Sequence, residues 1–114
     1  MLKNTKQLFD NIKNNKSEYI LKILSKNNNI DINIIDNNGN YFIEYIIMNK
    51  EINLLEKILE KKNTKIDIID NNGFSILYNP IKYDCFKIVD LLLKHNKTNI
   101  GISIIDQQDK FKNT

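Results

Sequence analysis

A pentapeptide of the form Ile-x-Ile-Ile-Asp occurs three times in the 114-residue chain. The copies span residues 32–36, 66–70 and 102–106, so they begin 34 and 36 residues apart. The first two continue as Asp-Asn-Asn-Gly, whereas the third continues as Asp-Gln-Gln-Asp. Self-similarity at a period of about 20–50 residues is typical of repeat architectures. We therefore predict a repeat protein.

One unit of the repeat predicts a hairpin, two helices and a loop. Asn38-Gly39 is a turn signal, because both residue types tolerate positive φ. Apolar residues then recur at helical spacing over 42–47 and again over 52–59. The polar segment 49–51 separates the two runs, and a polar loop over 62–65 leads into the next pentapeptide.

The same order fits the rest of the chain. Pro80 falls inside the expected first helix of the third unit and should shorten or kink it. Ser17 precedes the second N-terminal helix, where we expect it to act as the N-cap. We expect one domain made of an N-terminal capping repeat (1–35), a second repeat (36–69) and a third repeat (70–105). Residues 106–114 are either the degenerate start of a further repeat or a polar tail.

The isoleucine-rich elements also resemble buried β-strands. Three such strands separated by helices would form a parallel βαβ sheet. Two observations count against this alternative. The pentapeptides end directly in turn signals, and two expected helices separate each pair of pentapeptides where a βαβ unit needs one.

The unit resembles the ankyrin repeat over roughly residues 5–106. Asp36 with Gly39 and Asp70 with Gly73 match its opening, and the segment 88–93, Ile-Val-Asp-Leu-Leu-Leu, matches its second helix. The resemblance implies an all-α solenoid of about three helix-turn-helix units joined by short β-hairpin loops. HEAT-like or irregular α-hairpin repeats are the nearest competitors.

The family's Thr-Pro-Leu-His tetrapeptide is not kept. It is replaced by Tyr-Phe-Ile-Glu at 41–44 and by Ser-Ile-Leu-Tyr at 75–78. The sequence leaves open what replaces the hydrogen bonds of the family's threonine and histidine.

The composition is skewed toward 22 Ile, 20 Asn and 17 Lys, with no Arg, Ala or Trp. This bias indicates an AT-rich genome, such as that of a large DNA virus, a protist or an intracellular bacterium. Patches rich in Asn or Lys are therefore weak binding signals. A net charge of +3 spread along the chain, without arginine, argues against nucleic acid as the partner.

We expect an intracellular and most simply cytoplasmic protein without a membrane partner. The apolar runs are far shorter than the ~20 residues that span a bilayer, and the N-terminus lacks an apolar signal segment. Cys85 is the single cysteine, which excludes an intrachain disulfide.

No pattern in the chain predicts catalysis, a metal site or a cofactor. Cys85 and His95 lack metal-ligand spacing. We expect Cys85 to pack at the start of a helix and His95 to be solvated in that helix's last turn. Asp36, Asp70 and Asp106 are interpreted as turn formers. We predict a non-enzymatic protein, and an enzyme of unknown type remains a remote alternative.

The resemblance implies that another protein, a host protein among the candidates, binds the hairpin tips and the exposed side of the first helices. Met48, Phe74 and Tyr83 are the best candidates, because aromatics and methionine are enriched in interfaces. The alternative is self-assembly, or docking on further repeats. The expected contact residues are Asn37, Asn38, Asn40, Met48 and Asn49 in the second unit and Asn71, Asn72, Phe74, Lys82 and Tyr83 in the third.

Overall fold

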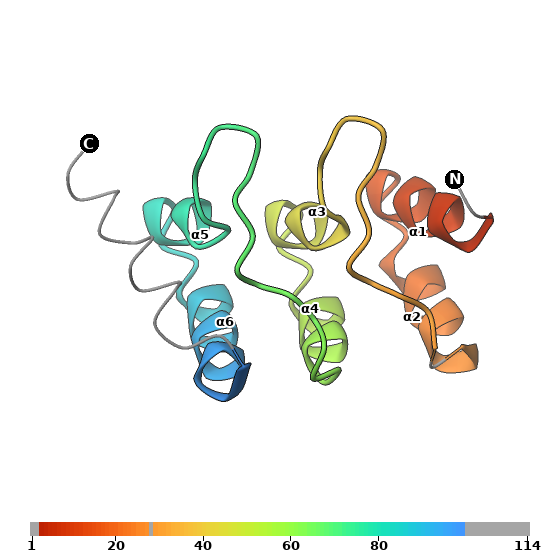
Figure 1. Cartoon of the computed structure of the whole chain (residues 1–114). Coiled ribbons are helices and arrows are strands. Elements are labelled where there is room, and N and C mark those ends of the chain that lie inside the picture. The colour runs from red at the N-terminus through yellow and green to blue at the C-terminus, as the bar shows by residue number, and fades with distance from the viewer. Residues whose placement is uncertain (1–2, 28, 100–114) are drawn as a thin grey trace. The chain divides into compact units, whose positions relative to one another are not determined.

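The computed structural model describes residues 3–27 and 29–99, which form six α-helices in three pairs (Figure 1). Within these ranges the extended backbone pairs only as isolated antiparallel bridges, so no parallel sheet forms there. The predicted all-α helical repeat is confirmed. The pairs are α1 (Lys3–Lys13) with α2 (Ser17–Lys26), α3 (Phe42–Met48) with α4 (Ile52–Leu59), and α5 (Tyr78–Lys82) with α6 (Phe86–Asn99).

The chain divides into two compact units, one ending at Ile58 and the other beginning at Leu59. The expected repeat boundaries place one helix pair in each of 1–35, 36–69 and 70–105, and these boundaries stay a prediction. The third pentapeptide at 102–106 and the tail 106–114 lie outside the described residues.

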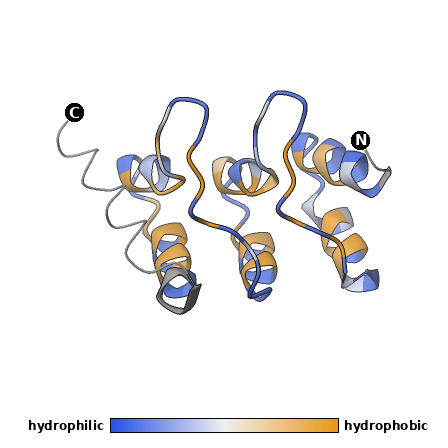
Figure 2. Ribbon diagram, in the orientation of Figure 1, coloured by the Kyte–Doolittle hydropathy of each residue, from blue (hydrophilic) through white to orange (hydrophobic). Residues whose placement is uncertain are grey.

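In the first unit, α1 packs on both α2 and α3. Leu8, Phe9 and Ile12 lie on one face of α1 because they are spaced by three or four residues, and each is buried. The ring of Phe9 meets that of Phe42 edge to face, with centroids 5.7 Å apart. Figure 2 shows hydrophobic residues on the facing sides of α1 and α2 and hydrophilic residues along the hairpin loop.

In the second unit, α5 packs on α6. The first two isoleucines of the pentapeptide, Ile66 and Ile68, are buried, whereas the third, Ile69, is 42% exposed. Successive side chains of extended backbone point to opposite sides, which accounts for the apolar spacing of the pentapeptide. The other buried apolar residues of this unit are Ile76, Leu77, Ile88 and Leu92.

Pro80 shortens its helix as predicted. The helix α5 has five residues, against seven in α3. Proline has no amide hydrogen, and the first turn of a helix is the part that tolerates this loss. Pro80 is the third residue of α5 and is buried, so its ring contributes to the core of the unit.

The prediction that Ser17 is an N-cap is wrong. The helix α2 begins at Ser17 itself, and Lys16 takes the N-cap position without a side-chain cap. The carbonyl of Lys16 accepts hydrogen bonds from the amides of Tyr19 and Ile20. The helix therefore starts one residue earlier than expected.

The prediction that His95 is solvated is also wrong. Its side chain is buried, and its Nε2 lies 2.8 Å from the carbonyl oxygen of Thr64, which is buried as well. The helix α6 continues to Asn99, so His95 lies within the helix and not in its last turn. It ties α6 to the loop that precedes the second hairpin.

Three non-glycine residues with positive φ mark the turns inside the helix pairs. Asn15, Lys50 and Asp84 have φ values of 59°, 56° and 57°. Each lies two residues after the last residue of the first helix of its pair. Left-handed backbone costs an L-residue about 1–2 kcal/mol, and asparagine tolerates it better than lysine.

Replacing Lys50 with glycine is expected to raise the free energy of unfolding by roughly 0.5–1 kcal/mol, because glycine adopts this φ without a Cβ clash. Glu56→Gly, at an exposed position near the middle of α4, is the control and should lower it by about 1 kcal/mol. Urea denaturation followed by circular dichroism measures both variants. A loss of stability in Lys50→Gly equal to that in the control would contradict the strain assigned to this turn.

Candidate functional site

Each hairpin tip is organised by the carboxylate of its aspartate. Asp36 Oδ1 accepts hydrogen bonds from the amides of Asn38 and Asn40, both at 3.0 Å. Asp70 Oδ1 accepts the equivalent bonds from Asn72 and Phe74, both at 2.9 Å. The turn-forming interpretation of these two aspartates is confirmed, while Asp106 lies outside the described residues.

The glycines complete the two turns. Gly39 and Gly73 have φ values of 82° and 84°, and their amides donate to the carbonyls of Asp36 and Asp70 at 3.0 Å. Glycine alone supplies the left-handed conformation, because neither Asn38 nor Asn72 has positive φ. One antiparallel bridge follows on each hairpin, Ile35 to Tyr41 and Ile69 to Ser75.

The first hairpin is further fixed by an ionic network. The hydroxyl of Tyr45 donates to Asp36 Oδ2, and Lys13 Nζ of α1 lies 3.4 Å from the same oxygen. Lys13 Nζ also lies 5.3 Å from the centroid of the Tyr45 ring and 5.7 Å from that of Phe9. The lysine thus joins α1, the hairpin and α3 within the first unit.

The network shifts two pKa values. Burial alone would raise the pKa of Asp36, but hydrogen bonds from Tyr45, Asn40, Asn38 and Lys13 outweigh it, and the pKa lies below its ordinary value of 3.8. Burial and the hydrogen bond to Asp36 raise the pKa of Tyr45. At neutral pH the carboxylate is therefore charged and the phenol is a donor.

A side chain near the start of α3 and another ahead of α5 accept a hydrogen bond from the backbone. Glu44 Oε2 accepts a hydrogen bond from the amide of Tyr41 at 2.6 Å, which caps α3. Ser75 Oγ accepts one from the amide of Leu77 at 3.1 Å ahead of α5. Glu44 stands at the histidine position of the family's tetrapeptide and Ser75 at its threonine position, so the two units use different positions for this hydrogen bond.

A cavity of about 400 Å³ lies beside the first hairpin tip. Its walls include Lys6 and Asp10 of α1 and the tip residues Asn37 and Asn38. Two of the predicted contact residues therefore lie next to side chains of α1 that the sequence did not suggest.

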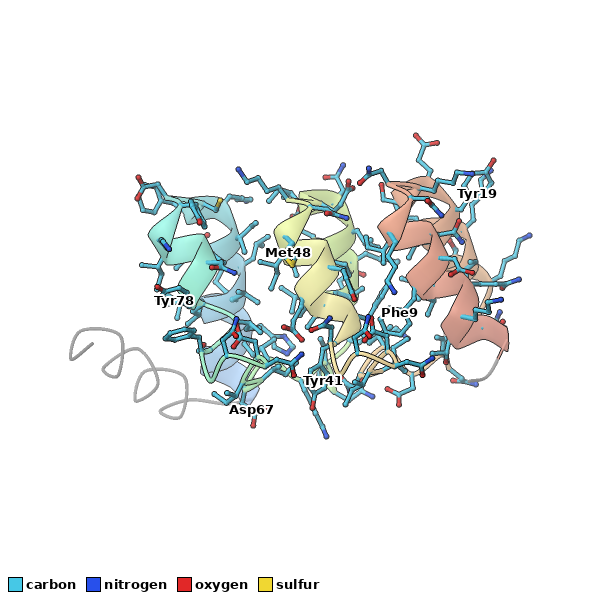
Figure 3. The ribbon with its side chains drawn as sticks, turned by 90° about the horizontal axis from the view of Figure 1, so that it is seen from above. Phe9, Tyr19, Tyr41, Met48, Asp67 and Tyr78 are labelled. Atoms are coloured by element: carbon cyan, nitrogen blue, oxygen red, sulfur yellow. The ribbon has the colours of Figure 1, made fainter. Side chains whose placement is uncertain are left out.

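The other predicted contact residues of this hairpin and of the end of α3 differ in their exposure and in their hydrogen bonds. Met48 is 63% exposed, and Figure 3 shows it at the end of α3 opposite to Tyr41. Asn40 is half-buried and its Nδ2 donates to the hydroxyl of Tyr45 at 3.2 Å. Asn49 Nδ2 donates to the carbonyl of Ile12 at 3.0 Å.

In the second unit the structure brings three predicted residues together with a fourth that the sequence did not single out. The ring of Phe74 stacks on that of Tyr78, with centroids 4.3 Å apart and planes 14° from parallel. Lys82 Nζ lies 5.7 Å from the centroid of Tyr78 and 5.5 Å from that of Tyr83. We call these four residues the α5 row. Asn71 and Asn72 stand apart from it, exposed at the hairpin tip.

Tyr78 was missed although a signal was present. It lies four residues before Lys82 on α5, which is the spacing of neighbours on one helix face. Five further exposed apolar residues were not predicted. Tyr19 of α2 lies close to the ammonium groups of Lys16 and Lys22, and the other four residues are Ile35, Ile69, Ile81 and Phe86.

Cys85 is half-buried just before α6, with its Sγ 3.7 Å from the carbonyl oxygen of Tyr83. Nowhere in the described ranges do three or more His, Cys, Asp or Glu side chains gather in a set that could hold a metal ion. None of the helices within those ranges is both long and apolar enough to cross a bilayer.

Asp36→Asn is expected to lower the free energy of unfolding at neutral pH by about 1–3 kcal/mol, because buried donors lose a charged acceptor. Since the folded-state pKa of Asp36 is depressed, its contribution is present above 3.8 and is lost as the pH falls through the lower folded value. Urea denaturation across the acid range should show this loss in the wild type and not in the variant. Asp70→Asn replaces the charged acceptor of the same two amide bonds with a neutral one, at a carboxylate with no tyrosine or lysine partner among the described residues, and this control should cost less.

Comparison with known proteins identifies the family. The family model for ankyrin repeats (3 copies) matches residues 8–104. A protein of Acanthamoeba polyphaga mimivirus that bears the name ankyrin repeat protein L371 is 35% identical over 105 residues, which cover 90% of this chain and 14% of the relative. The chain thus spans about one seventh of that relative's length. No solved structure matches the chain. Because the family model covers most of its length and a hairpin precedes each of the second and third helix pairs, the chain belongs to the ankyrin repeat family.

Proposed function

We propose that the chain is a non-enzymatic module that binds another protein through its hairpin tips and first helices. Ankyrin repeats are generally protein–protein interaction modules, which supports the class of function. The observation that carries the proposal is the α5 row, where side chains suited to an interface gather beside a hairpin. The partner in this proposal is a protein of unassigned identity, with a host protein among the candidates.

The rings of the α5 row support a contact surface. Tyr83 is 63% exposed, although it carries a large apolar ring. Phe74 is half-buried, and its stack on Tyr78 fixes its orientation. Tyrosine is enriched among the residues that dominate binding energy, and rings held in place lose little conformational entropy on binding.

The first unit offers a second part of the proposed surface. Asn37 and Asn38 border the cavity beside α1, and Met48 is exposed at the end of α3. We assign supporting roles to Asn40 and Asn49, because their amide groups donate within the chain. Asn71 and Asn72 belong to the proposed surface as exposed tip residues.

The proposal extends to organisation and location. It treats residues 1–35, 36–69 and 70–105 as successive repeats of one binding domain, with 106–114 as a degenerate start or a tail. It places the protein inside the cell, in the cytoplasm, which a single cysteine supports.

The double variant Phe74→Ala/Tyr83→Ala is expected to weaken partner binding by about tenfold or more, because it removes two anchor rings. The partner is first identified by pull-down from the native cellular context and mass spectrometry, and its affinity is then measured by calorimetry. Tyr19→Ala, which removes an exposed ring from α2, is the control. Equal affinity for the wild type and the double variant, with unchanged helical circular dichroism, would refute the assignment.

Exposed apolar side chains favour one alternative, in which the chain docks on further repeats or on a second copy. Ile81 is 41% exposed and Phe86 is 69% exposed, and both belong to the second unit. Large exposed apolar groups that lie together often mark an interface.

Under this alternative, light scattering should give a mass above that of one chain that rises with concentration. Phe86→Lys should return the protein to a monomer, because it places a charge in the apolar contact. Glu56→Lys, at an exposed position of α4, is the control. A single-chain mass at high concentration would exclude self-association.

A further inference from the structure

Each hairpin tip carries an asparagine directly followed by glycine, Asn38-Gly39 and Asn72-Gly73. Both asparagines and both glycines are exposed. Asparagine is a thermolabile residue. Glycine makes the pair more reactive, because it has no side chain to hinder an attack by its own backbone nitrogen on the asparagine side chain before it. The hairpin tips are therefore candidates for a covalent change as well as for binding.

The covalent change is deamidation, and water is its only reactant. The glycine nitrogen gives up its hydrogen to base and forms a bond to the side-chain carbonyl carbon of the asparagine. The bond from that carbon to the side-chain nitrogen breaks, and ammonia leaves. Water then opens the cyclic imide at either carbonyl and yields aspartate or isoaspartate. One such event replaces a neutral amide with a carboxylate and changes the formal net charge from +3 to +2.

The native turn occupies the nitrogen that would attack. The amide of Gly39 donates to the carbonyl of Asp36, and the amide of Gly73 donates to the carbonyl of Asp70, both at 3.0 Å. The nitrogen has to lose this hydrogen bond before it reacts, because the same hydrogen has to leave. The reactive pair is therefore protected as long as the turn stays closed.

The aspartate holds the turn closed on both sides of the reactive pair. In the second hairpin, Asp70 Oδ1 accepts the amide of Asn72 before the glycine and that of Phe74 after it, both at 2.9 Å. The amide of Asp70 donates in return to the carbonyl of Phe74 at 2.8 Å. Asp36 makes the same three bonds in the first hairpin, at 2.9–3.0 Å. Hydrogen bonds to a charged acceptor are the stronger kind, so opening either turn breaks several such bonds together.

We propose that Asn38 and Asn72 are deamidation sites and that Asp36 and Asp70 control the rate at which they react. Opening of the turn sets this rate. Isoaspartate places one extra atom in the backbone ahead of the glycine, so a modified turn does not re-form the same hydrogen bonds. Both asparagines belong to the proposed contact surface, where the new carboxylate would lie. The inference itself does not depend on the proposed function.

Ageing the full chain at neutral pH, followed by peptide mass spectrometry, measures the conversion at each asparagine. A protease that cuts before aspartate but not before isoaspartate separates the two products. Both sites should react about tenfold more slowly in the native chain than in the chain unfolded in guanidinium. A tenfold change corresponds to about 1.4 kcal/mol, which is comparable with one hydrogen bond to a charged group. Asn53, exposed on α4 and followed by leucine, is the internal reference and should stay unchanged.

Two variants test the control by aspartate. Asp70→Ala should raise the rate at Asn72 about tenfold and leave that at Asn38 unchanged, and Asp36→Ala should do the reverse, so each site is the control for the other. Asp67→Ala removes an exposed carboxylate from the segment before the second hairpin and should change neither rate.

Asp70→Asn keeps a neutral acceptor and should give a smaller rise at Asn72. This variant replaces Asp70→Ala in the test if the alanine variant loses its helical circular dichroism. Equal rates in the native and the unfolded wild type would overturn the inference. An unchanged rate at Asn72 in the folded Asp70 variant, or an equal rise in Asp67→Ala, would overturn it as well.

Discussion

None of the first helices is long enough to be stable by itself. The helices α3 and α5 have seven and five residues, whereas isolated helices shorter than about 12–15 residues are marginal in water. Their stability must come from burial of an apolar face, at about 1.5–3 kcal/mol for each fully buried large aliphatic side chain. In the first unit, Ile43, Ile46 and Ile47 provide that face on α3. Every other feature, including the orientation of the hairpins, depends on this packing.

The same turn is supported in two different ways. Both aspartates bind the amides two and four residues downstream. Around the buried Asp36, the half-buried Tyr45 and the partly exposed Lys13 add an ionic network that is sensitive to acid. Beside the second hairpin, Phe74 stacks on Tyr78. The first hairpin thus uses its polar groups within the unit, whereas beside the second the ammonium group of Lys82 lies between the rings of Tyr78 and Tyr83.

Period and local chemistry were sufficient to predict the helix pairs, the hairpins, the shortening at Pro80 and the turn role of the aspartates. These depend on neighbours in sequence. The sequence did not predict contacts between distant residues. The hydrogen bond from His95 to Thr64 and the pairing of Lys13 with Asp36 join residues 31 and 23 positions apart. For the candidate site, the sequence favoured Met48, Phe74 and Tyr83 over the asparagines. The structure brings Phe74, Lys82 and Tyr83 together around Tyr78. The spacing of Tyr78 from Lys82 was a signal for one of these contacts, but the ring stack with Phe74 depends on how the hairpin meets the helix.

Under the proposed function, the short length of α5 limits the size of the ligand segment that the α5 row contacts. Five residues of α-helix rise about 7.5 Å, and extended peptide advances about 3.3 Å per residue. The α5 row therefore matches a footprint of only two or three residues of a ligand. Such a short motif would bind weakly by itself. Useful affinity would require other repeats to engage the same ligand at high effective concentration, so that each repeat reads one short segment of a longer one.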